Sequence, residues 1–184
     1  MHNIFNDEQK ALLNLPPRND TEAESLAHYN FPEGLLKFEG QKFIFPDGFN
    51  VDVIAKWLEE SLLSVEIEVD AVIQAECARC LKVTSLEISE NLGYLYYLHS
   101  AEEEAVDDFG DYMPVEIDYF GKVIDIMPQI QESIFTLLPT KVLCKEDCKG
   151  LCPNCGADLN EGPCSCKIES VDPRLEALRN FVIE

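Results

Sequence analysis

Six of the eight cysteines lie within 23 residues in the C-terminal part of the chain. Within this cluster, Cys152-Pro-Asn-Cys155-Gly156 has the spacing of a zinc knuckle, in which a tight turn presents two thiolates to one ion and the glycine permits close approach of the backbone. The spacing recurs at Cys77-Ala-Arg-Cys80. The pattern predicts two four-cysteine zinc sites, although it does not fix which cysteine binds which ion. The clustered cysteines are Cys144, Cys148, Cys152, Cys155, Cys164 and Cys166.

One division of the eight thiols is preferred. The last four can bind one ion, because a loop of only eight residues separates the knuckle from the final pair. These four are Cys152, Cys155, Cys164 and Cys166. The other two clustered cysteines would then join the distant pair on a second ion and staple the C-terminal segment to a turn of the sheet. This second set is Cys77, Cys80, Cys144 and Cys148, and the alternative that Cys77 and Cys80 only form a structural turn or a partial motif stays open.

Other interpretations of the cysteines are weaker. Buried structural cysteines are not expected at ligand-like intervals among charged neighbours such as Lys145, Glu146 and Asp147. Disulfides are disfavoured because the chain is expected in a reducing compartment. A redox dithiol usually occurs as one pair, and an iron–sulfur cluster is a poorer match to a short, closed knuckle. Zinc is therefore the predicted cofactor.

The length and composition predict one domain with a small appended module. A chain of 184 residues with 46% hydrophobic residues can bury one good core. We expect an α+β core domain over residues 1–140, and a zinc-binding segment followed by a C-terminal helix over residues 141–184. No apolar run approaches the ~20 residues of a membrane span, and the first residues lack the layout of a signal peptide. The expected location is the cytoplasm.

The charge of the chain is strongly acidic and unevenly distributed. A net charge of −21 makes the field of the whole chain repel phosphate groups and membrane surfaces, which disfavours generic nucleic-acid binding. Residues 140–167, in contrast, are formally neutral. Any RNA contact in this segment would have to come from its lysines. The lysines assigned to such a contact are Lys141, Lys145 and Lys149.

Hydrophobic periodicity predicts several strands. Over residues 64–76, Val65 and Ile67 alternate with Glu66 and Glu68, which indicates a strand with one core face and one acidic face. The Cys77–Cys80 pair would lie at the turn into the returning strand. Other strands are expected in a hairpin over residues 35–45, over 81–90, over 91–98 and, as an edge strand or turn, over 118–125.

Four helices are expected beside these strands. In the second of them, Val53 and Trp57 recur at helical spacing after a capping Asp52. The third has an apolar face and ends at Pro139. The acidic stretch 102–108 is expected to be a loop. The four helices start near Asn6, at Asp52, after Asp125 and at Asp172.

Signatures of enzymes are scarce. His2, His28 and His99 are isolated, and the chain has neither a Gly-rich phosphate loop nor a nucleophile elbow. Carboxylates that are close in sequence are weak evidence for general acid–base catalysis in a chain with 35 of them. The sequence predicts a protein without catalytic activity.

The order of these motifs resembles the YceD family of bacteria and plastids. An acidic strand leads into Cys77-Ala-Arg-Cys80-Leu81, and an apolar helix ends at Pro139. The stretch Cys148-Lys-Gly-Leu-Cys-Pro-Asn-Cys-Gly-Ala-Asp-Leu-Asn160 and the later Asp172-Pro-Arg-Leu-Glu-Ala-Leu178 complete the pattern over residues 64–184. The resemblance implies a role in the accumulation of large-subunit ribosomal RNA, and hence in ribosome biogenesis, without known catalysis.

The resemblance also bears on the site and on the partners. Family members can lack much of the C-terminal cluster while keeping the Cys-x-Arg-Cys turn, which implies that the metal stabilises structure and performs no chemistry. It leaves Arg79 and Lys82 as candidate partner contacts, beside the alternative that Arg79 only pairs with a neighbouring glutamate. The expected partners are large-subunit precursor ribosomal RNA, a basic large-subunit ribosomal protein, or both. Neither a membrane nor a small-molecule substrate is expected.

Together these features predict an α+β fold: an antiparallel β-sheet with helices packed on it and a small C-terminal zinc-binding Cys-rich segment. Two rival functions remain open. One is a thiol-dependent or RNA-modifying enzyme that uses an unligated cysteine. The other is an acidic protein-interaction module unrelated to ribosomes.

Overall fold

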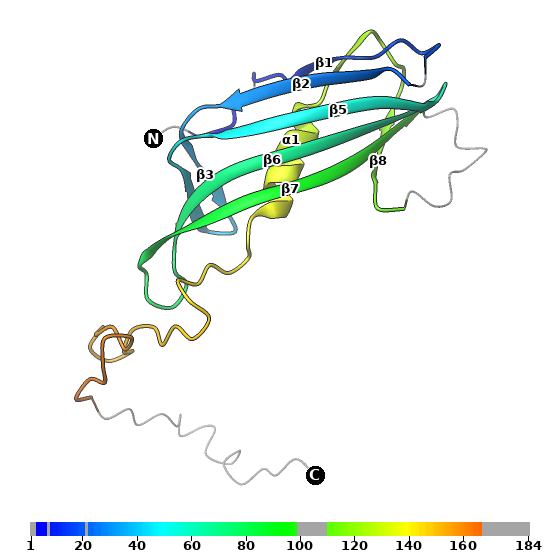
Figure 1. Ribbon diagram of the computed structural model, residues 1–184. Coiled ribbons are helices and arrows are strands. Elements are labelled where there is room, and N and C mark those ends of the chain that lie inside the picture. The colour runs from blue at the N-terminus through cyan, green and yellow to red at the C-terminus, as the bar shows by residue number, and fades with distance from the viewer. Residues whose placement is uncertain (1–2, 7, 21, 99–109, 167–184) are drawn as a thin grey trace, which may run out of the picture.

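The computed structural model describes residues 3–6, 8–20, 22–98 and 110–166. In this part of the chain a seven-stranded sheet forms the body, with a two-stranded sheet and one helix beside it (Figure 1). The helix is α1 (Met127–Leu137). The strands are β1 (Leu12–Asn14), β2 (Glu24–Phe31), β3 (Gly34–Phe38), β4 (Gln41–Phe45), β5 (Phe49–Glu59), β6 (Leu62–Glu76), β7 (Val83–Leu98), β8 (Met113–Ile117) and β9 (Val123–Asp125).

Strand β6 lies at the centre of the larger sheet. One of its edges pairs with β5 and then, at Gln74, with β4, while its other edge pairs with β7 from Leu62 to Glu76. Strands β2 and β3 extend the sheet beyond β5 and β4, and β8 pairs with β7 in parallel. The β6–β7 hairpin carries its turn, residues 77–82, beyond the end of the sheet toward the cysteine-rich segment (Figure 1).

The alternating strand predicted around residues 64–76 is confirmed as β6. Val65, Ile67 and Val69 are fully buried, whereas Glu68 and Asp70, which follow Ile67 and Val69, are exposed. Each acidic side chain points away from the core because side chains alternate between the two faces of a strand. The sheet therefore has an inner face that packs on the core and an outer face that carries carboxylates.

The helix predicted after Asp52 is wrong, because this segment is strand β5. Val51, Val53, Ala55 and Trp57 are buried and alternate with exposed or half-buried residues. Two apolar residues four positions apart fit one face of a helix and also one face of a strand, so the spacing of Val53 and Trp57 did not distinguish the two. Strands β2 and β6 satisfy the backbone groups of β5 on its two edges, which favours the extended conformation.

The predicted N-terminal helix is also wrong. Residues Leu12–Asn14 form β1, which pairs with β9 more than 100 residues later, and the N–H of Ala11 donates to Asp125 Oδ1 at 3.1 Å. Leu13 is buried, and the carbonyl oxygen of Pro16 accepts a hydrogen bond of 2.9 Å from Trp57 Nε1. These partners are distant in sequence, so a local pattern could not reveal them.

The other predicted strands are confirmed with different boundaries. The hairpin over residues 35–45 is formed by β3 and β4. The two strands expected over 81–90 and 91–98 are one continuous strand, β7. The short strand expected over 118–125 is β9. The acidic stretch 102–108 lies outside the described residues.

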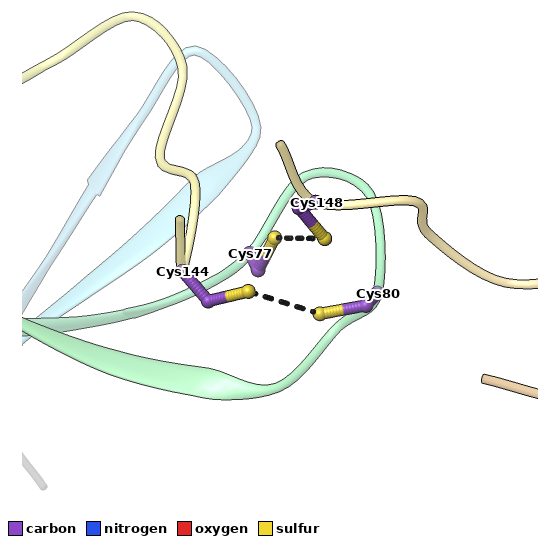
Figure 2. A group of neighbouring side chains, drawn as sticks. All are labelled: Cys77, Cys80, Cys144 and Cys148. Atoms are coloured by element: carbon purple, nitrogen blue, oxygen red, sulfur yellow. Dashed lines mark hydrogen bonds between the residues drawn. The ribbon is translucent and has the colours of Figure 1, made fainter. Parts of the chain in front are cut away.

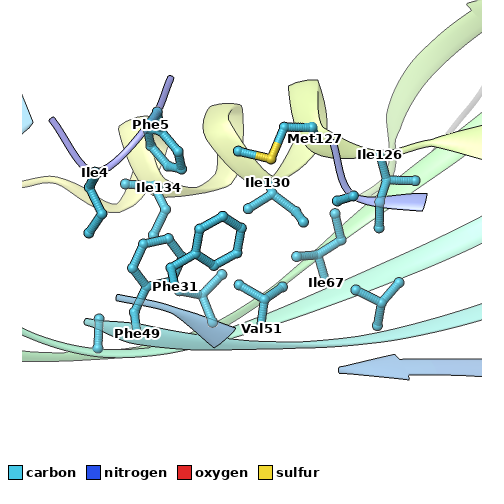
Figure 3. Packing of buried hydrophobic residues seen from close by; sticks show 14 of the residues in the cluster. Ile4, Phe5, Phe31, Phe49, Val51, Ile67, Ile126, Met127, Ile130 and Ile134 are labelled. Carbon is cyan, nitrogen blue, oxygen red and sulfur yellow. The ribbon is translucent and has the colours of Figure 1, made fainter. Parts of the chain in front are cut away.

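Helix α1 corresponds to the third predicted helix and packs on the inner face of the sheet (Figure 3). Ile126, Ile130 and Ile134 point from the helix and its N-cap toward Val51 and Ile67 of the sheet, and all five are buried. Pro128 lies in the first turn, where its missing N–H removes no helical hydrogen bond. Burial of this apolar stripe supplies the main attraction between helix and sheet.

The architecture is mostly antiparallel sheet with this one short helix in the described part of the chain. Helices are therefore fewer than the α+β prediction expected. The helix predicted from Asp172 lies outside the described residues. No helix in the described part is long and apolar enough to cross a membrane.

Truncation of Ile130 tests the contact between helix and sheet. Ile130→Ala should lower the free energy of unfolding by about 2–5 kcal/mol, because it leaves a cavity between α1 and the sheet. Ile54→Ala on the outer face, where the side chain is 41% exposed, should change it by only about 0.5 kcal/mol. Urea denaturation of both variants measures the difference. Equal losses would contradict the assignment of inner and outer faces.

Candidate metal centres

Four cysteines from two distant segments meet beyond the end of the sheet. Cys77 and Cys80 come from the β6–β7 turn, and Cys144 and Cys148 come from the segment that follows α1 (Figure 2). Their four sulfur atoms all lie within 4.8 Å of one another. The Cys77 and Cys148 sulfurs are 3.8 Å apart, and those of Cys80 and Cys144 are 3.5 Å apart. We call this set the first centre.

The spacing of these sulfurs fits a metal ion. A tetrahedral zinc site with Zn–S bonds of about 2.3 Å places its sulfurs about 3.8 Å apart. A disulfide would need about 2.05 Å, and all eight cysteines are free thiols. Three of the four residues are buried, so the thiols converge in a site that is partly shielded from water. The first centre could therefore hold a metal ion.

The second centre is local. Cys152, Cys155, Cys164 and Cys166 also bring their four sulfurs within 4.8 Å of one another. Cys152 is buried and Cys155 is exposed, so this centre lies closer to solvent than the first. The two sets are the same two groups of four that the sequence pattern favoured, and each could hold one ion.

The two Cys-x-x-Cys turns have the same backbone geometry. The N–H of Gly156 donates to the carbonyl of Cys152 at 2.9 Å, and the N–H of Leu81 donates to the carbonyl of Cys77 at 2.9 Å. Both turns also close with a bond from the N–H of the first cysteine to the carbonyl five residues later, at Lys82 and Ala157. The turn at Cys77 thus has the backbone hydrogen bonds of the knuckle at Cys152.

The residue after each knuckle has a left-handed backbone conformation. Gly156 has φ of 73°, which glycine adopts at no steric cost. Leu81 has φ of 59° at the equivalent place, although a Cβ atom disfavours this conformation. The missing glycine explains why the sequence of the first knuckle looks incomplete.

Hydrogen bonds separate the thiol pKa values in the first centre. Burial raises the pKa of Cys77, but hydrogen bonds from the backbone N–H groups of Arg79, Cys144 and Cys80 outweigh it and lower this pKa to about 6. The hydrogen bond between Cys80 and Cys144 raises the pKa of Cys144 to about 12. Burial also raises the pKa of Cys148, but hydrogen bonds from the Asn160 side chain and the Gly150 N–H outweigh it and lower this pKa, whereas the pKa of Cys80 is raised. Two thiols therefore ionise more readily than the other two, which keep their protons until a cation replaces them.

The second centre repeats this arrangement. Backbone N–H groups of Cys155 and Asn154 lower the pKa of Cys152 to about 6. The hydrogen bond with Cys155 raises the pKa of Cys166 to about 12. In both centres, backbone N–H groups lower the pKa of the first cysteine of the knuckle to about 6.

A network of polar side chains joins the two centres. The amide of Asn160 donates to the Cys148 sulfur at 3.5 Å and to Asp158 Oδ1 at 2.7 Å. The ammonium of Lys82 lies 2.8 Å from Asp158 Oδ2 and 3.3 Å from Glu161 Oε1, and these two carboxylates raise the pKa of Lys82. The carboxylate of Asp158 is mostly covered. The hairpin that carries the first knuckle is thereby tied to the loop that carries the second.

Arg79 and Gly150 bring the two segments into close contact. Arg79 Nη1 donates to the carbonyl oxygens of Glu146 at 3.2 Å and Cys148 at 2.7 Å. The carbonyl of Arg79 accepts from the N–H of Leu151 at 3.2 Å. A Cβ atom on Gly150 would lie only 2.9 Å from the Arg79 carbonyl oxygen. Within the described residues, Arg79 therefore bonds to backbone carbonyls, whereas the alternative interpretation had paired it with a neighbouring glutamate side chain.

The candidate partner residues fall into two groups. Arg79 and Lys82 take part in contacts between the hairpin and the cysteine-rich segment. Lys141, Lys145 and Lys149 are exposed, and Lys145 lies 3.8 Å from Asp147. Sequence reasoning missed Asp158 and Asn160 as links between the centres. Their Asp-Leu-Asn spacing, in which the side chain of Asp158 bonds to the N–H of Asn160 at 2.8 Å, was the available signal.

Two glycine substitutions test the packing of the cysteine-rich segment on the hairpin. Gly150→Ala should weaken it, because the new methyl group meets the Arg79 carbonyl and φ is 75°. Gly156→Ala carries the same conformational cost at φ of 73° but has nothing within 4 Å of the new atom. Limited proteolysis of the metal-loaded proteins should therefore cleave the Gly150 variant faster, by about the tenfold that corresponds to 1.4 kcal/mol. Equal cleavage would contradict the close contact.

Comparison with known proteins places the chain in a family. The family model described as large ribosomal RNA subunit accumulation protein YceD matches residues 65–182. An uncharacterized protein of Mycobacterium tuberculosis is 31% identical over 130 residues, which cover 68% of this chain and 58% of that protein. The large ribosomal RNA subunit accumulation protein YCED homolog 1, chloroplastic, of Arabidopsis thaliana is 30% identical over 163 residues, which cover 74% of this chain and 50% of that protein.

The chain thus spans between 50% and 58% of the length of these two relatives. No solved structure matches it. The matched region starts in β6 and includes both knuckles and all eight cysteines. The chain belongs to the YceD family.

Proposed function

We propose that this protein is a non-catalytic ribosome-biogenesis factor that supports accumulation of large-subunit ribosomal RNA. The observation that carries the proposal is the family match over residues 65–182, together with the printed name of the Arabidopsis relative. The match includes the region in which the hairpin and the cysteine-rich segment meet. This region is therefore the part of the chain most directly tied to the function.

In this proposal the two centres hold zinc with a structural role. Four thiolates complete the tetrahedral coordination of Zn²⁺, so neither centre keeps an open position for water or substrate. The first centre fastens the segment after α1 to the β6–β7 turn, and the second closes the loop from Cys152 to Cys166. Bound zinc would supply cross-links where the chain has few apolar residues to bury.

The enzyme alternative is disfavoured by the grouping of the thiols. A thiol-dependent or RNA-modifying enzyme needs an unligated cysteine, and all eight cysteines belong to one of the two sets of four. A loaded chain would keep no free nucleophile. An acidic interaction module that acts outside the ribosome remains the second rival, and identification of the cellular partners separates it from the favoured function.

The exposed lysines are the proposed contact with precursor ribosomal RNA or its protein neighbours. Lys141, Lys145 and Lys149 lie in or beside the first centre, in a segment whose formal charge is zero. The rest of the chain carries the whole excess of negative charge and repels phosphate groups. Four thiolates on each Zn²⁺ leave the centres themselves with negative charge, so the exposed lysines are the groups of this segment through which RNA phosphates would approach.

Metal analysis tests the two centres. The purified chain should contain two zinc ions, and Cys80→Ser and Cys155→Ser should each retain one, because the sets share no ligand. Acid should release zinc from both, since protons compete with the metal for thiolates. Elemental analysis after gel filtration provides the count, and alkylation with iodoacetamide provides the control. A cysteine that reacts rapidly in the loaded protein would contradict full ligation and support the enzyme alternative.

Crosslinking in cells tests the proposed function. After ultraviolet irradiation, the purified chain should carry large-subunit precursor RNA, and Lys145→Glu with Lys149→Glu should reduce this association severalfold through charge repulsion. Lys37→Glu with Lys42→Glu, which changes two exposed lysines of the β3–β4 hairpin, is the charge-matched control. An unchanged association for the Lys145 and Lys149 variant would refute the lysine contact. Recovery of neither precursor RNA nor ribosomal proteins would refute the function itself.

A further inference from the structure

The face of the sheet opposite α1 is an open surface made of aligned cross-strand rows. Residues that lie opposite each other in an antiparallel sheet point to the same face. We call the surface formed by these exposed rows of β2, β5, β6 and β7 the outer face. Its two central rows are His28, Asp52, Glu68 and Asn91, and Asn30, Asn50, Asp70 and Ser89.

Carboxylates gather in the central part of the outer face. Glu68, Asp70 and Glu87 are exposed, and no ion pair forms to any of them within the described residues. Asp47 and Asp70 line a shallow hollow of about 360 Å³ together with Val72 and Glu87. Like charges on neighbouring sheet positions destabilise the fold. A cationic partner would remove this repulsion.

Apolar side chains continue this surface toward the first knuckle. Val72 is 40% exposed, and Val83 and Leu81 are 63% and 59% exposed. Leu81 and Val83 line a second hollow of about 640 Å³, together with Ile44 and Gln74. Acidic groups near the β4–β5 turn and apolar groups near the first knuckle therefore lie on the same face of the sheet.

Leu81 is an independent indication that this face is a binding surface. Its backbone has the left-handed φ of 59° that glycine fills in the second knuckle. A leucine is strained in this backbone conformation. Its side chain is largely exposed, so it adds little to the packing of the core. Contact with a partner would bury this side chain, which the isolated chain leaves exposed.

We propose that the outer face docks a basic polypeptide segment whose Lys and Arg side chains pair with Glu68, Asp70 and Glu87 and whose apolar side chains cover Val72, Leu81 and Val83. Charge complementarity selects this occupant. RNA is excluded from the face because its phosphates would meet the same carboxylates. A second copy of the chain would bring identical negative faces together.

We assign the docked segment to a basic large-subunit ribosomal protein. This assignment rests on the proposed function and specifies its protein partner. The outer face and the exposed lysines would then bind different components of one precursor. The acidic face holds the basic protein, and Lys141, Lys145 and Lys149 approach the RNA.

Binding to individually purified large-subunit ribosomal proteins of the same organism tests the proposal. One or more of them should bind the full chain, and the variant Glu68→Gln, Asp70→Asn, Glu87→Gln should bind about tenfold more weakly, because three charge pairs are lost. The charge-matched control is Glu8→Gln, Glu22→Gln, Glu33→Gln, at exposed positions outside the central rows. This control should bind within about twofold of the unmodified chain.

Leu81→Gly separates binding from folding. This substitution relieves the strained φ and removes the apolar contact, so thermal stability and zinc content should be equal or higher while binding weakens. Weaker binding with preserved zinc supports the docking surface. Unchanged binding by this variant and by the triple outer-face variant refutes it.

The remaining outcomes are also decisive. If the outer-face variant changes binding of transcribed precursor RNA, or abolishes self-association of the chain, the occupant is RNA or a second copy and the proposal is wrong. If it binds ribosomal proteins normally while the lysine variants lose precursor RNA in cells, the outer-face proposal fails and the proposed function stands. If outer-face-dependent binding persists but cells yield no ribosomal material, the proposed function fails and the docking of a basic segment stands.

Discussion

The convergence of four thiols at the end of the β6–β7 hairpin determines how the cysteine-rich segment relates to the rest of the molecule. The segment has few apolar residues, and the buried cluster around it consists mainly of Cys77, Cys80 and Cys148, with Leu143 and Leu151 beside them. Burial of so little apolar surface cannot offset the entropy lost when a segment of this length becomes ordered. The thiols, the bonds of Arg79 and the ion pair of Lys82 with Asp158 supply the necessary attachment.

The fold could be predicted from the sequence where the spacing of apolar residues fitted either a strand or a helix but not both. The strict alternation around Val65 and Ile67 identified β6, and the apolar stripe through Ile130 identified α1. The segment around Val53 and Trp57 was misassigned because a spacing of four is compatible with both a helix and a strand. The N-terminal strand was missed because its hydrogen-bond partners lie in β9, far away in the sequence. Both errors arose where long-range pairing overrode local pattern.

The grouping of the thiols could be predicted from the sequence more readily than the hydrogen bonds and ion pairs around them. Spacing alone favoured the two sets of four, because a short loop can close around one ion. The pattern did not reveal that Lys82 pairs with Asp158, that Asn160 contacts the Cys148 sulfur, or that Arg79 binds backbone carbonyls. These contacts depend on how a hairpin and a later segment pack together. The sequence of either segment by itself does not show which of these polar groups contact the other segment.

The difference in sequence separation between the two centres implies an order of assembly. The first centre joins sulfurs 64 and 71 residues apart, so its four ligands converge only after β6, β7 and α1 have folded together. The second centre needs only the local chain from Cys152 to Cys166 and can form as soon as that stretch has been synthesised. Metal in the second centre would therefore report only that a loop has closed. Metal in the first would report that the hairpin, the helix and the cysteine-rich segment have reached their native arrangement.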